Sequence, residues 1–202
     1  MATSKTVIAN LALSHLGIGK EIADLDTENS EEANACRRFY EESRDKALRD
    51  FNWPFATRIE NLTLVETNPN NEWSYSYRYP VNAVGIRRIL SGIRNDTRQS
   101  RVPYRRTKDA TGGLILCDLD SAQVEYTERL EQVELYPSDF VMALSYLLAV
   151  YIAPRITSGD PFGLGNKAAQ FYSIELSNAR ANAHNEEQPD AVVESEFVRG
   201  RE

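Results

Sequence analysis

Apolar residues recur at the spacing of an α-helix in the first part of the chain. The pattern predicts one helix from about Ser4 to Leu16. A second helix is expected to begin at Asn29, a good N-cap residue, with Glu32 three residues later in the position of a capping box. This helix should run to the segment around Phe51.

Two further helices are predicted in the last part of the chain. The first begins at Pro137 and ends near Pro154, because proline suits the first turn of a helix and interrupts a helix elsewhere. A glycine-containing loop, residues 157–165, leads to the second, which carries apolar positions over residues 168–183. From Asn185 onward the chain is polar and acidic without helical spacing, so we expect a flexible tail.

The spacing changes to period two between these two pairs of helices. Trp73, Tyr75, Tyr77 and Tyr79 alternate with polar residues, which predicts a strand with one aromatic face. We expect that face to pack within the sheet, although aromatic rings can also stack on nucleic-acid bases. Further strands are predicted at Val84–Leu90, Val102–Thr107, Leu114–Cys117 and Ala122–Glu128.

The order of these elements predicts an α+β fold that is mainly helical. Residues 1–55 and 136–185 should form a discontinuous core that resembles a four-helix bundle. Residues 56–135 should form an antiparallel β subdomain inserted into that core, and residues 186–202 the flexible C-terminal tail.

The segment from Phe51 to Ala56 marks the corner between the helical and β regions. It places large apolar side chains around a proline, which cannot continue a helix and forces the preceding Trp53 into an extended conformation. The residues expected to form the structural core are Trp53, Pro54, Phe55, Phe140, Leu144, Leu147 and Tyr151.

Charge is distributed unevenly along the chain. The net charge of −7 argues against a protein that binds nucleic acid over its whole surface. Basic residues nevertheless gather in the β region, while the tail is acidic, and this asymmetry favours docking between charged protein surfaces. The candidate interface residues are Arg87, Arg88, Arg94, Arg98, Arg101, Arg105 and Arg106, together with Glu186, Glu187, Asp190, Glu194, Glu196 and Phe197 of the tail.

The sequence contains no recognisable catalytic or metal-binding motif. His15 and His184 are the only histidines, and neither has a second ligand at metal spacing, so we expect no metal, no cofactor and no catalytic triad. Cys36 and Cys117 are expected to be buried thiols. No run of apolar residues reaches the length of a membrane span, so no membrane association is expected. Paired carboxylates, as in a glycoside hydrolase, are the one enzymatic arrangement left open.

Several segments together resemble the head-to-tail adaptor family of short-tailed bacteriophages, whose members are called tail tubular protein A or gatekeeper-type tail accessory factor. The resemblance extends to about Asn185, and adaptors of long-tailed phages share a similar helical core. The segments that carry it, in chain order, are Ala12–Gly17, Ile22–Asp26, Asn52–Ala56, Trp73–Pro80, Val124–Tyr126, Tyr136–Phe140 and Ala143–Pro154.

The resemblance implies a structural role without an active site. Such adaptors add to the portal ring as a probable twelvefold ring, extend the channel toward the tail nozzle protein, retain the packaged genome and let it pass on ejection. The implied partners are the portal, the nozzle, other copies of the chain, tail fibres as a further candidate, and double-stranded DNA that passes without sequence-specific binding. The implied location is the virion, with the host cytoplasm during assembly. The acidic tail matches no motif of the family, but its composition suits docking onto the portal, where many tails in a ring gain from effective concentration.

Two other functions stay open at this point. One is a tail-associated cell-wall hydrolase that uses two carboxylates, which should show a pH-dependent rate. The other is a nucleic-acid binder that uses the arginine cluster, which should weaken steeply as salt is added.

Overall fold

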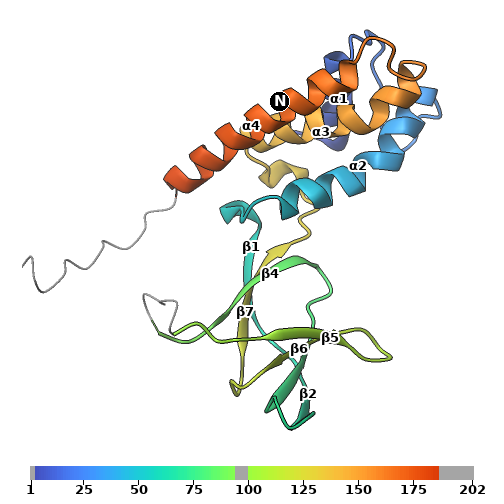
Figure 1. Ribbon diagram of the computed structural model, residues 1–202. Helices are drawn as coiled ribbons and strands as arrows, with labels where there is room; N and C mark the ends of the chain where they lie inside the picture. The colour runs from blue at the N-terminus through green and yellow to red at the C-terminus, as the bar shows by residue number, and fades with distance from the viewer. Residues whose placement is uncertain (1–2, 94–99, 187–202) are drawn as a thin grey trace, which may run out of the picture.

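The computed structural model describes residues 3–93 and 100–186 of the chain. Four helices lie together, and two antiparallel sheets extend from one side of them (Figure 1). The predicted α+β fold class is thereby confirmed. The elements in chain order are α1 (Lys5–His15), α2 (Glu31–Arg49), η1 (Pro54–Ala56), β1 (Thr57–Asn61), β2 (Leu64–Thr67), β3 (Tyr75–Arg78), β4 (Ala83–Leu90), β5 (Arg105–Lys108), β6 (Gly113–Cys117), β7 (Gln123–Glu128), η2 (Val133–Leu135), α3 (Ser138–Ile156) and α4 (Leu164–Glu186).

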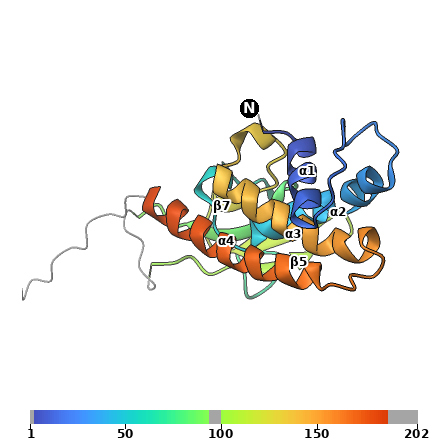
Figure 2. The same ribbon diagram turned by 90° about the horizontal axis from the view of Figure 1, so that it is seen from above.

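Helix α3 is the centre of the helical part. It packs against α1, α2 and α4, and Figure 2 shows it running beside α1 and α4. The predicted core residues Phe140, Leu144 and Leu147 are buried on this helix, and Tyr151 is half-buried. By length and composition alone α3 could also cross a membrane, the one helix of the described chain that could. It packs against three other helices, and ten of its residues are buried, as in a core helix.

Serine side chains begin the first two helices. Ser4 caps α1 by accepting a hydrogen bond from the Val7 amide, which confirms the predicted range of this helix. For α2 the predicted cap Asn29 is wrong by one residue, because Ser30 is the N-cap and accepts from the Ala33 amide. Serine caps a helix as well as asparagine does. Glu32 does not close a capping box with Asn29 and binds Lys20 at 2.6 Å instead.

The last two helices each extend beyond their predicted ends. Helix α3 continues past Pro154 to Ile156, since a proline in the last turn removes one backbone hydrogen bond and the amide of Thr157 still bonds to the Ala153 carbonyl. Helix α4 runs to Glu186, so Asn185 and Glu186 are helical and not part of a flexible tail. The remaining predicted tail, residues 187–202, lies outside the described part of the chain.

Strands β1, β7 and β4 form one sheet, and β2, β3, β6 and β5 form a second. The two sheets enclose a hydrophobic cluster separate from that of the helices, with Tyr77, Ile115 and Tyr126 among its buried members. Tyr77 is 1% exposed and its hydroxyl donates to the Leu119 carbonyl, so the aromatic face of β3 packs within the sheet as predicted. The sequence pattern did not single out β1 or β2 as strands. Cys117 is buried here, and Cys36 is buried among the helices, as predicted.

His15, at the end of α1, joins that helix to α3. Its ring stacks on Tyr146 with 3.7 Å between ring centroids. Its Nε2 lies 2.9 Å from the Oγ of Ser145, whose own proton is donated to the Met142 carbonyl. Nε2 is therefore the donor to Ser145, which fixes the neutral tautomer. Burial lowers the pKa of His15 below its ordinary 6.5.

This lowered pKa predicts a stability that falls in mild acid. As the pH falls through about 6.5, His15 of the unfolded chain takes up a proton before His15 of the folded chain does. This uptake lowers the free energy of unfolding as the pH falls toward the folded-state pKa of His15. Below that pKa the effect of His15 on the free energy of unfolding no longer grows. Chemical unfolding at a series of pH values should show a His15→Gln variant losing this component. His184→Gln, a change at an exposed histidine, should keep it; equal slopes for both variants would contradict the assignment.

Candidate interaction surface

Arg87 on β4 ties the sheets to the end of the helical part. Its guanidinium donates to Thr127 on β7, to Thr57 on β1 and to the carbonyl of Trp53 before η1, at 3.1, 2.5 and 2.8 Å. The side chain is 7% exposed. The planar fork of arginine suits several acceptors at once. Arg87 is therefore an internal connector between the sheet and the helical part, and not the exposed interface residue that was predicted.

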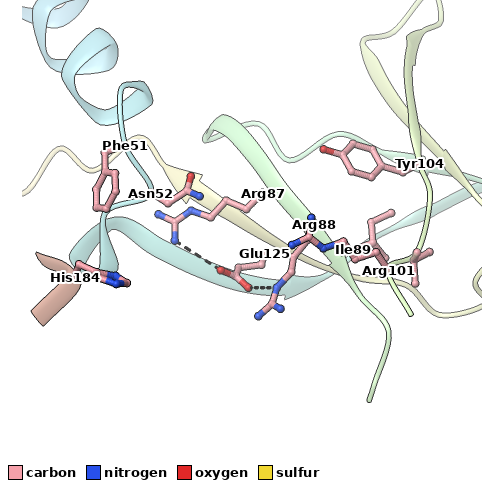
Figure 3. A pocket seen from close by; sticks show the side chains of 10 residues that line it. Phe51, Asn52, Arg87, Arg88, Ile89, Arg101, Tyr104, Glu125 and His184 are labelled. Carbon is pink, nitrogen blue, oxygen red and sulfur yellow. Dashed lines mark hydrogen bonds and ion pairs between the residues drawn. The ribbon is translucent and has the colours of Figure 1, made fainter. Parts of the chain in front are cut away.

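A pocket of about 560 Å³ opens beside Arg87, between the β4–β7 sheet and the helices. We call it the arginine pocket. Figure 3 shows side chains converging on it from both parts of the molecule. Its wall includes Arg87, Arg88 and Glu125 from the sheet, Arg101 and Tyr104 from the segment before β5, and Phe51 and His184 from the helical part.

Positive charge exceeds negative charge in the arginine pocket. Glu125 is the only acid among the described residues of its wall, and it lies 3.7 Å from Arg87 and 2.7 Å from Arg88 (Figure 3). One carboxylate is thus shared by two guanidinium groups. Arg101 forms none of the ion pairs between described residues. The pocket is therefore suited to a negatively charged group that brings further carboxylates or phosphates.

Strand β5 carries the second group of predicted arginines. It is an outer strand of its sheet, and its four residues are all exposed. Arg105 lies 3.4 Å from Glu72 at an exposed position, and the guanidinium of Arg106 lies 4.5 Å from the centre of the Tyr79 ring. Lys108 adds a third positive charge. We call Arg105–Lys108 the basic edge.

The predicted arginine cluster is thus divided by the fold. Arg88 and Arg101 line the arginine pocket, and Arg105 and Arg106 lie on the basic edge. Glu186 ends α4. The other predicted interface residues, Arg94, Arg98, Glu187, Asp190, Glu194, Glu196 and Phe197, lie outside the described residues.

The described carboxyl groups with clearly shifted pKa values all shift downward. In Asp109 the bidentate pair with Arg78 is the main cause, followed by the hydroxyl of Thr111. Hydrogen bonds from side chains likewise lower the pKa values of Asp24, Glu28 and Glu32. A glycoside hydrolase needs one carboxyl group with a raised pKa. Over residues 3–93 and 100–186, no three potential metal ligands cluster either.

Glu125, His184 and Tyr104 were not predicted as members of a site. His184 is far from the arginines in sequence, and only the course of α4 brings it to the pocket. Glu125 lies on β7 between β1 and β4, where it meets arginines of the neighbouring strand. The one signal available in the sequence was a single acid within a strand facing a basic region, which is common to many sheets.

No protein-family model and no curated protein matches this chain. Its function is therefore inferred from its own residues and surfaces.

Proposed function

We propose that this protein is a structural head-to-tail adaptor of a bacteriophage virion. Its subunits assemble as a ring on the portal, extend the DNA channel toward the tail nozzle, retain the packaged genome and allow its ejection. The four helices act as a bundle-like core, with α3 at the centre, and the sheets project from it. The protein functions by assembly, in the virion, and does not act as an enzyme.

The observation that carries the proposal is the unlike chemistry of the two outer strands of one sheet. A closed ring is built from heterologous contacts, so each subunit needs two different faces that complement each other. The basic edge on β5 exposes Arg105, Arg106 and Lys108. The opposite outer strand, β2, exposes Leu64, Val65 and Glu66. One strand is basic, and the other is apolar with an acid.

This pairing of unlike edges supports a contact between the β5 edge of one subunit and the β2 edge of the next. Outer strands with unpaired backbone groups are ready sites for association with another chain. Charges at interfaces direct partner choice and register more than they add affinity. Opposite charges on opposite edges would therefore orient every subunit in the same direction around the ring.

Charge reversal on either edge should reduce ring assembly, and reversal on both should restore it. We expect Arg106→Glu alone and Glu66→Arg alone each to lower the number of subunits that add to the portal, because each places like charges across the contact. The double variant should regain subunits, since every contact then pairs opposite charges again. Light scattering of the portal mixed with each variant measures this number.

Arg38→Glu provides the matched control, because Arg38 is an exposed arginine on α2, outside both edges. It should add to the portal like the unmodified protein. Single reversals that assemble normally, or a double variant no better than either single one, would contradict the edge contact.

A further inference from the structure

The arginine pocket has the composition of a peptide site more than that of a phosphate site. Arg88 and Arg101 supply positive charge at the rim, where Arg88 is 48% exposed. Buried Ile89 and the partly exposed Val102 add an apolar surface beside them. A free phosphate would use only the charges. A peptide with both carboxylates and apolar side chains would use the whole wall.

The chain itself supplies such a peptide at the rim of the pocket. His184 forms part of the wall, and α4 ends two residues later at Glu186. Residues 187–202 contain five acids and two arginines, a net charge of −3. Two of the acids, Glu194 and Glu196, lie three residues and one residue before Phe197. Acid and aromatic side chains are therefore adjacent, as the wall requires.

We infer that the arginine pocket binds the acidic segment 187–202 of the same chain, with Glu194 and Glu196 at the guanidinium groups of Arg88 and Arg101. Tethering at α4 gives the segment an effective concentration of about millimolar at the pocket, so a weak contact suffices. A peptide on another copy has no such advantage at low protein concentration.

This contact goes beyond the proposed adaptor function and does not depend on it. In a free subunit the pocket would hold the segment away from other partners. A partner that offers more basic groups than the pocket could then bind the segment in place of the pocket. The partner and the pocket would compete for the same carboxylates. The segment would be available only where that partner is present.

A nitroxide label on the segment tests this contact in the full-length protein alone. Ser195→Cys places the label between the two acids, and the native Cys36 and Cys117 are buried and so protected from labelling. The paramagnetic loss of amide signal at Arg88, Arg101 and Tyr104 measures proximity by NMR. We expect a large loss at low ionic strength that recovers in high salt, because the contact is electrostatic.

Variants separate docking from the mere closeness of a tethered segment. Arg101→Glu should restore most of the lost signal at Arg88 and Tyr104. The matched control Arg105→Glu, on the basic edge, should leave the loss unchanged. Combining Arg88→Glu and Arg101→Glu with Glu194→Arg and Glu196→Arg should bring the loss at Tyr104 back, since the charges of the proposed contact are then reversed on both sides.

Three results would overturn the inference. The first is no loss of signal in the unmodified pocket, and the second is the same loss with Arg101→Glu. The third is a loss that appears only between copies, which a mixture of nitroxide-labelled and isotope-labelled proteins reports. None of these results bears on portal binding, so the adaptor proposal stands or fails separately.

Discussion

Replacing Trp53 with alanine is expected to lower the free energy of unfolding by about 3–5 kcal/mol. Trp53 is 1% exposed and packs in edge-on contacts against Phe51 and Phe140, at 5.1 Å between ring centroids in each case. Its indole nitrogen donates to the Ala47 carbonyl at 2.9 Å. Alanine would leave a cavity among these rings and remove that hydrogen bond, so thermal or denaturant unfolding should shift strongly.

An exposed aromatic residue gives the control for Trp53→Ala. Phe162 is 79% exposed in the loop before α4. Phe162→Ala should therefore change stability by no more than about 0.5 kcal/mol. If Trp53→Ala unfolds at the same temperature as the unmodified protein, then Trp53 is not the centre of the corner between helices and sheets.

Replacing Arg87 with alanine should cost a comparable amount, about 3–5 kcal/mol, because it breaks a buried charged network. Glu125 would lose one of its two guanidinium partners, and Trp53 would lose a hydrogen bond to its carbonyl. These contacts join the first sheet to the segment that leaves α2. We therefore expect the loss to loosen the sheets relative to the helices as well as to lower the midpoint of unfolding.

Arg88→Ala is the matched control for Arg87→Ala. Arg88 also pairs with Glu125, but its side chain is 48% exposed, so Arg88→Ala should cost at most about 1 kcal/mol. Arg87→Lys should recover little of the loss, since an ammonium group cannot reach the same acceptors with the planar fork of arginine. Similar effects for Arg87→Ala and Arg88→Ala would contradict the assignment of Arg87 as an internal connector.

The helices could be predicted from the sequence because local rules determine them. Ser4 and the apolar spacing that follows it specify α1, and the extended Trp53 before Pro54 follows from proline geometry. The errors at Asn29 and Pro154 are small shifts along the same helices. They arise where two neighbouring residues could serve as cap, or where packing carries a helix past a proline.

Strands β1 and β2 could not be predicted from their own residues. All four residues of β2 are exposed, and β1 buries little, so neither shows a clear alternation of apolar and polar positions. Their pairing with β7 and β3 defines them. Short strands that obtain their hydrogen bonds from distant partners leave a weak local signal.

The arginine pocket could not be predicted because it depends on tertiary structure. The sequence grouped the arginines by proximity, but the fold turns Arg87 inward, places Arg88 and Arg101 at the pocket, and places Arg105 and Arg106 on an outer strand. The separation of buried from exposed arginines follows from the pairing of β4 with β7 and from the position of the Trp53 carbonyl. Neither is visible in a linear pattern of charge.

The mass of the protein in solution, alone and mixed with the portal ring of its own phage, tests the adaptor proposal most directly. Mass photometry or light scattering should show a complex heavier than the portal by a full ring of subunits. If the two proteins do not associate, the chain will remain at its own mass of 22.9 kDa in the mixture. That result would contradict the proposal.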